Sequence, residues 1–490
     1  MTETKYVELP GPERDFDWRR PYFVGIGGVG MAPLAAMCRA HGSAVAGHDR
    51  RESPAIGALK ERGVQVTIGD RREAAWADLG RSSVVVRSTA VRDDDPLLQA
   101  ARQAGIPVVH RSDLLAELMA GHRPVAVAGT HGKTTASAML ARALEEAGGD
   151  PSYVFGGDTE GPLSGVRVSP YESVFVAEAD ESDGSFTRYA PSVGVVLNVD
   201  DDHPERYAGV DDAVEAFIGF AATVREGGTL VCSADDAGAR RVAEAASARG
   251  LVNVVLVGEA DDAHWRVLDV TAARDGLSSQ VVVCGPEESV HSFTVHTPGR
   301  HNAGNAVAAL AAGVALGFTA ADLLPGLQAF AGVERRLQVV GDARGVVLID
   351  SFAHHPTAIT ADIAAARAVA GDGGRVIVVC QPSGYGRVQA LARALGQALA
   401  AADEVFLLKL HDLVGDPVPG VDSELIAGCL RDSARHAAVQ VREGLATVRA
   451  LDAVVKPGDV VLTTGPGQEV TRVAEGTLCA LASAVFAPVV

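Results

Sequence analysis

Aromatic residues are scarce in this sequence: Phe, Trp and Tyr together make up only 5% of its 490 residues. Hydrophobic residues nevertheless make up 47%, and there are 54 glycines, so the apolar residues are mostly small and aliphatic. This composition favours Ala- and Val-rich layers of helices and strands over an aromatic-rich β-sandwich. A chain of this length also exceeds one ordinary core, and about three domains are expected.

Cysteine is rare as well, with six residues in the chain. They lie far apart, without the paired spacing that would hold zinc or form a redox pair. We interpret them as small buried hydrophobic residues in a reducing compartment. They are Cys38, Cys232, Cys284, Cys380, Cys429 and Cys479.

Positive charge and long apolar runs are also lacking. The formal net charge of −19 would repel a phosphate backbone, and the sequence contains no basic run, so nucleic acid is not expected as a partner. Residues 1–20 mix acids, Arg and Pro without an apolar segment, which predicts no signal peptide. No later stretch offers about 18 uninterrupted apolar residues, so no membrane span is expected. The sequence predicts a cytoplasmic protein.

Three stretches of the chain each restart an alternation of short β-rich runs with Ala-rich helical segments. This pattern is typical of parallel sheets with crossover helices, and it predicts an α/β protein with domains at 1–120, 121–333 and 334–490. A less periodic, β-leaning passage from about 264 to 296 precedes a helix near Asn302. Strands are predicted at 22–25, 43–47, 83–86, 125–129, 174–177, 193–197, 230–231, 346–350, 376–379, 405–408 and 460–462.

A first glycine-rich loop follows the first predicted strand and opens a helix. Gly25, Gly27, Gly28 and Gly30 would let backbone N–H groups and the helix N-terminus approach a diphosphate. Asp49 closes the next strand, at the right distance along the chain to meet a ribose hydroxyl. Alone, the loop is compatible with NAD or FAD and equally with a UDP-sugar.

A second glycine-rich loop lies between a predicted strand and a helix, which is the context of a phosphate-binding loop. Its backbone amides would cradle nucleotide phosphates, Lys133 would supply a compact positive charge, and Thr134 would offer a hydroxyl to Mg²⁺. Lys133 is the only lysine between Lys60 and Lys409, which favours a required ammonium group there, with chance as the alternative interpretation. The residues predicted to hold ATP in this loop are Gly129, Thr130, His131, Gly132, Lys133, Thr134 and Thr135.

Acidic residues follow two predicted strands of the second stretch. The run 178–183 offers hard oxygen ligands at a strand end, where open α/β sheets bind their ligands, and Mg²⁺ needs only one or two carboxylates. A solvated acidic loop is the alternative interpretation. The run 198–203 follows the next strand, and its His203 is either a ligand of a cation or water or a lone surface histidine.

Taken together and in this order, several segments resemble the Mur ligase family. They are the first glycine loop with Met31, Gly129–Thr135, Glu178–Asp183, Asp202-His203-Pro204, Pro298–Asn302 with Asn305, Arg335-Arg336 and Ala353–Pro356. The resemblance extends from about residue 21 to 470 and is strongest with the branch that adds L-alanine in bacterial cell-wall synthesis. It implies a Rossmann-like N-terminal domain for the UDP-sugar, a central P-loop ATPase-like domain for ATP and Mg²⁺, and a Rossmann-like C-terminal domain for the amino acid.

The resemblance also implies an activity and a set of site residues. The expected reaction joins L-alanine to UDP-N-acetylmuramate through an acyl phosphate, with ATP as phosphoryl donor, in a monomer or homodimer. The implied residues are Lys133, Glu178 and His203 for catalysis; Thr134, Glu178 and His203 for Mg²⁺; Asn302, Asn305, Arg336 (with or without Arg335) and Asp350 for ATP; Ser88 and Thr89, with the first glycine loop and Asp49, for the UDP-sugar; and His354 and Arg387 for the amino acid. An alternative for His301 and Asn302 is a helix N-cap pair.

Three segments of the third stretch depart from the family pattern. Asp350-Ser351-Phe352 has one acid where two are usual, the segment 381–387 keeps only the charge of Arg387, and Gly465–Glu469 replaces a Gly-Ala-Gly-Asp-like turn. Three hypotheses therefore stay open: an alanine-adding ligase, a ligase of the same mechanism with another amine acceptor, and a nucleotide-binding homologue without turnover.

Overall fold

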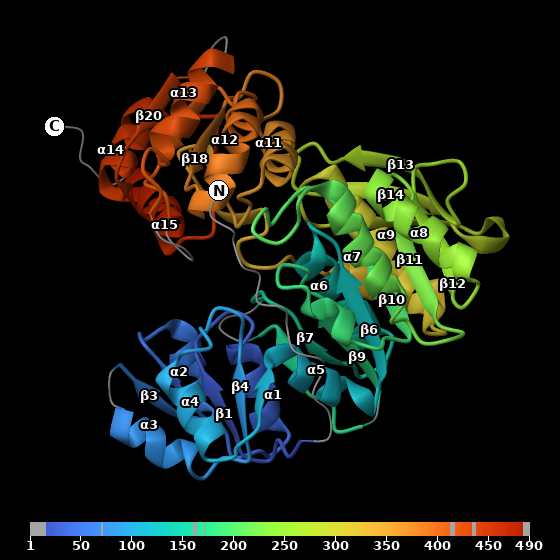
Figure 1. The fold of residues 1–490 in the computed structure, drawn as a ribbon. Coiled ribbons are helices and arrows are strands. Elements are labelled where there is room, and N and C mark those ends of the chain that lie inside the picture. The colour runs from blue at the N-terminus through green and yellow to red at the C-terminus, as the bar shows by residue number, and fades with distance from the viewer. Residues whose placement is uncertain are drawn as a thin grey trace.

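The computed structural model describes residues 16–69, 72–159, 164–171, 173–411, 417–433 and 438–483. Three sheets follow one another along the chain, each with its own helices, which confirms the predicted α/β class (Figure 1). The prediction of no signal peptide concerns residues 1–20, and residues 1–15 of this segment lie outside the described residues. Within the described ranges, no helix is both long enough and apolar enough to cross a membrane.

The first sheet has five parallel strands in the order β3-β2-β1-β4-β5. The chain leaves β1 in one direction and returns to β4 on its other side, so the carboxyl ends of β1 and β4 flank the switch point where such sheets bind ligands. The strands are β1 Pro21–Val24, β2 Ala46–Asp49, β3 Gln65–Ile68, β4 Val84–Arg87 and β5 Val108–His110, and the helices are α1 Ala32–Ala40, α2 Pro54–Glu61, α3 Arg72–Leu79, α4 Pro96–Gln103 and α5 Arg111–Ala120.

The central sheet has ten strands in the order β15-β14-β13-β12-β11-β10-β6-β9-β7-β8. Parallel strands form its middle, and the predicted β-leaning passage supplies the antiparallel strands β13, β14 and β15 at one edge. The strands are β6 Arg123–Ala128, β7 Ser152–Val154, β8 Val166–Arg167, β9 Val174–Glu178, β10 Val193–Val196, β11 Thr229–Ser233, β12 Asn253–Gly258, β13 Trp265–Ala272, β14 Ser279–Cys284 and β15 Val290–Val295. The helices are α6 Lys133–Glu146, α7 Val210–Ala221, α8 Ala237–Arg249, α9 Arg300–Ala315 and α10 Ala320–Ala329, with short 3₁₀ turns at Ser185–Arg188 and Pro286–Glu288.

The third sheet has six strands in the order β16-β17-β21-β18-β19-β20. Its first strand, β16, is antiparallel to β17 and precedes the strand that the sequence pattern predicts first in this stretch. The strands are β16 Gln338–Ala343, β17 Val346–Ser351, β18 Val376–Cys380, β19 Glu404–Leu407, β20 Ala438–Val441 and β21 Val460–Thr464, and the helices are α11 Pro356–Ala370, α12 Tyr385–Leu399, α13 Ser423–Ser433, α14 Gly444–Val454 and α15 Gln468–Ser483.

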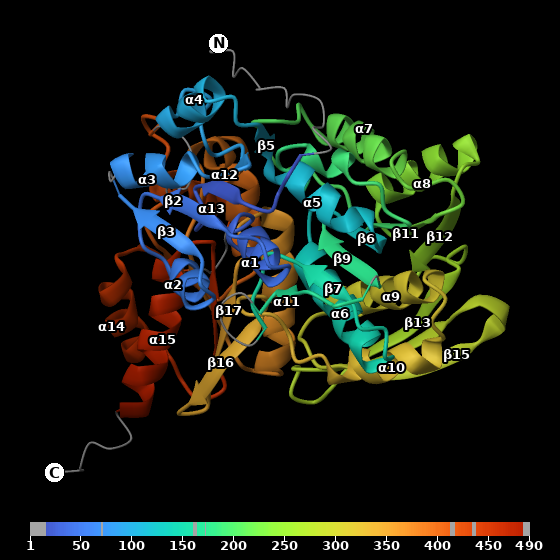
Figure 2. The same ribbon diagram turned by 90° about the horizontal axis from the view of Figure 1, so that it is seen from below.

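The hydrophobic cores join the three units unequally. One cluster runs from Phe23 and Val86 of the first sheet to Phe175 and Phe217 of the central unit, so these two units share a core. The third unit has separate cores on the two faces of its own sheet. Its helix α11 lies on the side that faces the central unit (Figure 2). Among the described residues, no such core cluster joins the third unit to the other two.

The cysteines are not uniformly buried. Cys38, Cys232 and Cys380 are buried as predicted, and burial raises the pKa of the Cys38 and Cys380 thiols to about 12. The prediction is wrong for Cys479, which is exposed because it lies away from the buried face of α15, and Cys284 and Cys429 are only partly buried.

Candidate active site

The second glycine loop connects β6 to α6 at the carboxyl edge of the central sheet. Gly129 and Gly132 have φ values of +143° and +85°, in the region that favours glycine. A Cβ atom on Gly132 would lie 2.7 Å from Oδ1 of Asn305, so a side chain there would collide with its neighbour. Asn198 fixes the loop from the next strand, because its Oδ1 accepts from the His131 N–H at 2.7 Å and its Nδ2 donates to the His131 carbonyl at 3.0 Å. The loop backbone is therefore held in place.

Lys133 is the first residue of α6, and its ammonium lies inside this loop. Nζ donates to the Gly129 carbonyl at 2.7 Å and to Glu181 Oε2 at 2.8 Å. Burial alone would lower the pKa of Lys133, but the neighbouring carboxylates, led by Glu181, outweigh it and the pKa is raised. Lys133 is therefore charged at neutral pH and fixed at the mouth of the loop.

Thr134 and Glu178 form an oxygen-rich corner beside Lys133. The Thr134 hydroxyl donates to Glu178 Oε2 at 3.1 Å, and the Gly156 N–H donates to the same oxygen at 2.9 Å. Arg336 reaches this corner from the segment before the third sheet, with Nη2 3.2 Å from Thr134 Oγ1. A hydroxyl and a carboxylate next to a phosphate-type loop are the ligands that Mg²⁺ prefers.

His203, the third predicted Mg²⁺ ligand, faces Glu181. Its Nε2 lies 3.8 Å from Glu181 Oε1, and its Nδ1 lies 3.0 Å from Glu205 Oε1. Burial would lower the pKa of His203, but Glu205, Asp202 and Glu181 raise it above its ordinary value. Among the described residues, Oε1 of Glu181 has no hydrogen-bond partner although Glu181 is buried. A cation or proton donor between these two side chains would satisfy that oxygen.

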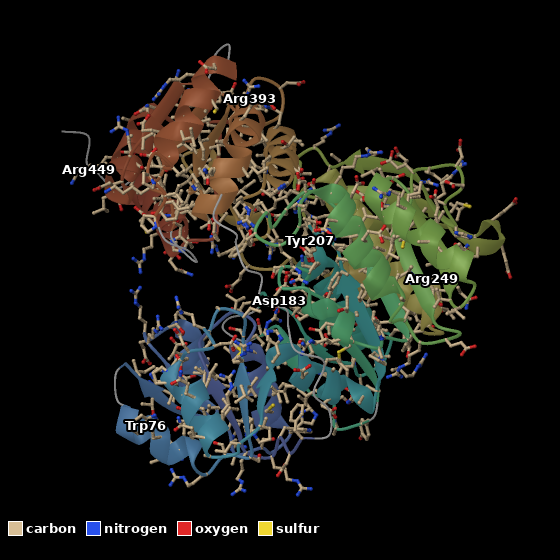
Figure 3. The ribbon with its side chains drawn as sticks, viewed as in Figure 1. Trp76, Asp183, Tyr207, Arg249, Arg393 and Arg449 are labelled. Atoms are coloured by element: carbon tan, nitrogen blue, oxygen red, sulfur yellow. The ribbon has the colours of Figure 1, made fainter. Side chains whose placement is uncertain are left out.

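Glu181 is a functional candidate that the sequence-based site did not include. Its backbone carbonyl accepts from the Tyr207 hydroxyl at 2.6 Å, in the middle of the molecule where Figure 3 labels Asp183 and Tyr207. Burial raises the pKa of Glu181, and the charge of Lys133 opposes that shift. Its position in an acidic run directly after β9 was a usable signal, because carboxyl ends of parallel strands gather at one edge.

Asn302 and Asn305 lie on α9 behind the loop. Asn302 Nδ2 donates to the Pro298 carbonyl at 2.7 Å, and Asn305 Nδ2 donates to Asn302 Oδ1 at 3.1 Å. The N-cap of α9 is Gly299, which has no side chain, and His301 and Asn302 lie inside the helix. The alternative of a His301–Asn302 cap pair is therefore wrong. Burial, assisted by the charge of His131, lowers the pKa of His301 to about 4. Asn305 contacts the loop at Gly132.

Arg335 and Arg336 are adjacent in sequence but point to different places. Arg335 has a φ of +59°, and its Nε donates to Asp350 Oδ2 at 3.1 Å while Nη1 donates to the Pro466 carbonyl at 3.2 Å. Arg336 extends to Thr134 instead. Both guanidinium groups lie over the Phe352 ring, at 5.2 and 5.0 Å from its centroid. Only Arg336 reaches the phosphate loop.

Asp350 is buried within the third unit. Its side chain accepts from Thr463 Oγ1 at 2.7 Å and Thr471 Oγ1 at 3.0 Å in addition to Arg335. The next residue, Ser351, donates through Oγ to Asp362 Oδ2 at 2.5 Å. Burial raises the pKa of Asp362 to about 7, and Arg336 is one of the groups that opposes this shift. A carboxyl group on α11 therefore lies beside the position where the family has a second acid.

His354, His355 and Arg387 lie where the third unit meets the central one. Arg387 donates through Nε and Nη2 to Asp202 Oδ1 at 3.0 and 2.9 Å. Burial, with the charge of Arg387, lowers the pKa of His354 to about 3, and Nδ1 of this residue lies 2.9 Å from the Phe352 carbonyl. His355 caps α11 and contacts the Asp201 carbonyl at 3.1 Å. The units meet here through polar side chains.

The first glycine loop lies between β1 and α1, as predicted, and the strand order places it at the switch point of the first sheet. Asp49, at the end of β2, accepts from the Gly27 N–H at 2.8 Å, so the acid and the loop lie together. Gly28 and Gly30 are exposed, and Gly25 has a φ of +76°. Ser88 and Thr89 follow β4, the strand next to β1. These residues share one edge of the sheet.

A buried ion network joins this first site to the central one. Arg111, at the start of α5, donates through Nη2 to Asp180 at 3.1 Å and to Asp183 at 3.0 Å, and Thr89 Oγ1 donates to Asp183 at 3.4 Å. Burial lowers the pKa of His110, which lies 3.5 Å from Asp183, to about 3. The network keeps the two ligand edges in a fixed relation.

Family models match almost the whole chain. They are described as "Mur ligase family, catalytic domain" for residues 20–123, "Mur ligase middle domain" for 127–313 and "Mur ligase, glutamate ligase domain" for 335–467. These matched ranges correspond to the three sheets in order.

Curated relatives and solved structures show the same similarity. The UDP-N-acetylmuramate–L-alanine ligases of Streptomyces coelicolor and Streptomyces avermitilis are each 48% identical over 448 residues, which span 91% of this chain and 95% and 94% of those proteins. The crystal structure of UDP-N-acetylmuramate-alanine ligase MurC from Thermotoga maritima aligns with a TM-score of 0.75 at 24% identity over 95% of this chain and 99% of that one. A murein peptide ligase from Psychrobacter arcticus aligns with a TM-score of 0.67 at 24% identity over 94% and 98%. At these identities the structures support the fold alone.

Proposed function

The chain belongs to the Mur ligase family, and from that premise we propose that it joins L-alanine to the lactyl carboxylate of UDP-N-acetylmuramate in peptidoglycan precursor synthesis. One observation carries the proposal: Lys133, Thr134, Glu178 and Arg336 meet at one phosphate-type loop. The chain is also 48% identical over 91% of its length to relatives named for this reaction.

The first step is a phosphoryl transfer. A carboxylate oxygen of the sugar attacks the γ-phosphorus of ATP, the bond to the β-phosphate oxygen breaks, and ADP leaves an acyl phosphate behind. Negative charge spreads over the equatorial oxygens, so fixed cations lower the barrier. Lys133 and Arg336 are two fixed cations at the loop, and Lys133 is held there by Glu181.

The second step forms the amide. The free amine of alanine attacks the acyl carbon, inorganic phosphate leaves with the C–O bonding pair, and the nitrogen loses a proton to the surroundings. Water would destroy the acyl phosphate, so the third unit must cover the site during this step. His354 and Arg387 lie at the contact between the units, and we assign them to the amino acid.

The residues fit a bound Mg²⁺ ion. Thr134 and Glu178 supply oxygen ligands beside the loop, and His203 faces Oε1 of Glu181, which accepts no hydrogen bond from the described residues. When bound, Mg²⁺ supplies positive charge to the β- and γ-phosphates. Glu181 is therefore added to the predicted residues at this corner.

The remaining assignments follow the same geometry. We assign the loop 129–135, with Asn302 and Asn305 behind it, to the nucleotide, and the edge formed by Gly25–Gly30, Asp49, Ser88 and Thr89 to the UDP-sugar. Asp350 acts on the nucleotide indirectly, because it holds Arg335, which in turn donates to carbonyls of the turn at 465–467.

We further propose that the protein acts in the cytoplasm on small molecules, without nucleic acid or membrane, as a monomer or homodimer. Its net charge of −19 supports the proposal that nucleic acid is not a partner. Light scattering after gel filtration would establish the oligomeric state.

Phosphate release tests the function. Purified protein with MgATP and UDP-N-acetylmuramate should release phosphate when L-alanine is added, with an amide product of matching mass. Glycine, L-serine and a preformed tripeptide form the comparison panel. Release only with another acceptor would replace alanine in the proposal, and nucleotide binding without release in any mixture would refute it.

A further inference from the structure

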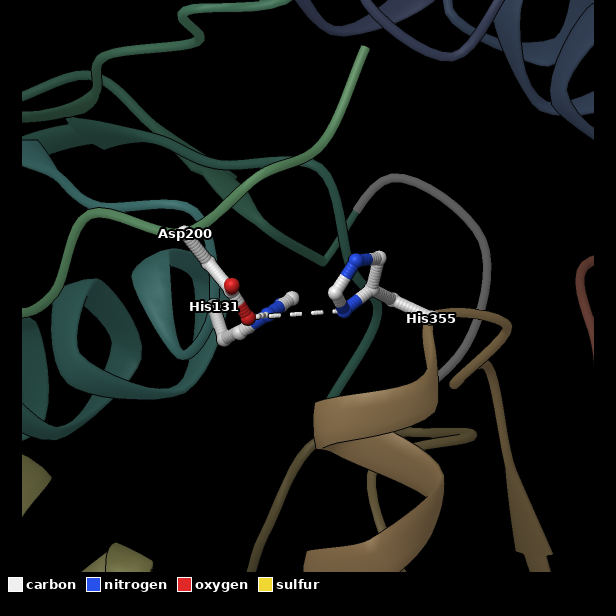
Figure 4. Close-up of side chains that lie close together, drawn as sticks. All are labelled: His131, Asp200 and His355. Atoms are coloured by element: carbon white, nitrogen blue, oxygen red, sulfur yellow. Dashed lines mark hydrogen bonds and ion pairs between the residues drawn. The ribbon is translucent and has the colours of Figure 1, made fainter. Parts of the chain in front are cut away.

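Two histidines and an aspartate meet where the third unit contacts the phosphate loop (Figure 4). His131 belongs to the loop, Asp200 follows β10, and His355 caps α11 of the third unit. One nitrogen of each ring and one carboxylate oxygen lie within 4.8 Å of one another. Asp200 Oδ2 lies between the rings, 3.0 Å from His131 Nε2 and 3.5 Å from His355 Nδ1. No other group of three or more such side chains is found among the described residues.

The hydrogen bonds of His355 make its Nδ1 an acceptor at the edge of this cluster. Its Nε2 lies 3.1 Å from the Asp201 carbonyl, which can only accept, so Nε2 carries the proton in the neutral ring. Nδ1 is then an acceptor that faces the carboxylate of Asp200, another acceptor. A ring N–H given to a backbone carbonyl is also the arrangement that orients a metal-ligating histidine. Nδ1 also accepts from the Thr357 N–H at 3.3 Å, which is the N-cap hydrogen bond of α11, and a cation bound at Nδ1 would displace this long bond.

The other two residues are fixed from behind. The backbone of His131 makes two hydrogen bonds to the Asn198 side chain, and the Asp200 N–H donates to Thr130 Oγ1 at 2.9 Å. All three side chains are at least partly buried. The donors are thus preorganised, which reduces the entropy lost on binding an ion.

We propose that His131, Asp200 and His355 form a binding site for a borderline divalent cation of the Zn²⁺ or Co²⁺ type. Two imidazoles and one carboxylate, with a fourth position left to water, match the ligand set of such ions, whereas Mg²⁺ prefers oxygen alone. None of the three side chains belongs to the Thr134–Glu178 corner, although His131 lies in the loop assigned to the nucleotide, and binding of the ion does not depend on the proposed ligase reaction.

The ligands come from two different units of the protein. His131 and Asp200 belong to the central unit and His355 to the third, so an ion held by all three fixes the third unit against the phosphate loop. Binding of the ion and docking of the third unit therefore favour each other, as thermodynamic linkage requires.

Titration of the full-length protein with Co²⁺ alone, without nucleotide, tests the site. We expect one equivalent to give the intense visible absorption of a four-coordinate ion with nitrogen ligands, and Zn²⁺ to displace it. His355→Gln and Asp200→Asn should each weaken Co²⁺ binding at least tenfold. His203→Gln, which changes the Mg²⁺ corner, and His291→Gln, which lies far away beside Trp265, should leave the spectrum unchanged.

A measurement on the unmodified protein guards against variants that fold poorly. X-ray absorption of the protein with one equivalent of Zn²⁺ should show scattering from two imidazole rings. An oxygen-only shell, or Co²⁺ binding that survives both His355→Gln and Asp200→Asn in folded protein, would overturn the proposal.

Discussion

The candidate ATP site has two halves that are built in different ways. The central half comes from short contiguous motifs at the ends of β6 and β9, and its charges are already paired, as in Lys133 with Glu181. The half from the third unit is assembled from residues between 335 and 471, and it holds two buried carboxyl groups, Asp350 and Asp362. Asp350 is paired with Arg335, whereas burial dominates the pKa of Asp362.

The charged groups of the central half would act on the phosphates directly, whereas those of the other half hold neighbouring residues in position. In the central half, loss of one group leaves a buried partner and removes a contact to the reacting phosphates. In the other half, the carboxyl groups position Arg335 and adjoin Arg336, so they act through other residues. The units are also joined differently, by shared core on one side of the central unit and by polar contacts on the other.

Lys133→Ala should have the largest effect. It removes a fixed cation from the transferring phosphoryl group, and we expect kcat to fall roughly 10³-fold. It also leaves Glu181 buried without its partner, which should lower the free energy of unfolding by about 3 kcal/mol. Alanine-dependent phosphate release and urea unfolding measure the two effects.

The double variant Lys133→Ala with Glu181→Gln is the matched control. It should recover most of the lost stability, because no buried carboxylate remains unpaired, while activity stays low. Recovery of activity in the double variant would show that Lys133 serves only to neutralise Glu181.

The pH dependence of stability should reveal Asp362. Its pKa is raised to about 7 in the folded protein, so between about pH 4 and pH 7 the folded state keeps a proton that the unfolded chain has lost. The stabilising contribution of Asp362 to the free energy of unfolding is fully present below about pH 4. It falls by up to about 4 kcal/mol as the pH rises from about 4 through the folded-state pKa near 7. Asp362→Asn should remove this decline in urea unfolding measured from pH 4 to pH 8.

The exposed residue Asp94 provides the comparison for that experiment. Asp94→Asn should keep the decline of the wild type, because this carboxyl lies in solvent beside Arg92. A decline that persists in Asp362→Asn would contradict the assignment to Asp362.

Ser351→Asp should have a smaller effect, and a harmful one. The new carboxyl would lie against Asp362, whose Oδ2 is 2.5 Å from Ser351 Oγ, and two buried acids there repel each other. We expect kcat to fall about tenfold, equivalent to about 1.4 kcal/mol. Combining Ser351→Asp with Asp362→Ser should restore activity to within about twofold. A rise in activity from Ser351→Asp alone would mean instead that the third unit lacks a needed acid.

The sequence predicts the central half better than the other half for physical reasons. The loop at 129–135 and the acids after β9 and β10 are local, because strand ends of a parallel sheet meet at one edge wherever they occur in the chain. The antiparallel strand β16 was missed because its register depends on pairing with β17. Strand β2 begins at Ala46, later than the predicted strand at 43–47, since strand limits are set by neighbours as well as by propensity.

The details of the third unit depend on long-range contacts that no local pattern encodes. Asp362 lies within α11, where an acid normally indicates a solvated face, and only packing places it against Ser351. Arg335 and Arg336 diverge because Arg335 adopts a left-handed φ, which a pair of arginines does not predict. The sequence places Asp202 at the end of a strand, but it does not predict the partner of Asp202, Arg387, which lies 185 residues away along the chain.

Arg387→Lys should give the smallest change and should probe the contact between the halves. Arginine supplies Nε and Nη2 to one oxygen of Asp202, whereas lysine supplies a single point charge, so kcat/KM for alanine should fall about threefold, equivalent to less than 1 kcal/mol. Asp202→Asn should have a similar effect, and the two changes together should cost less than their sum, because they remove the same contact. Arg240→Lys, at the exposed pair with Asp262, is the matched control and should leave kcat/KM unchanged. Additive effects at 202 and 387 would mean that Arg387 binds the amino acid without acting through Asp202, and that the two halves of the site meet through Arg336 and His355 instead.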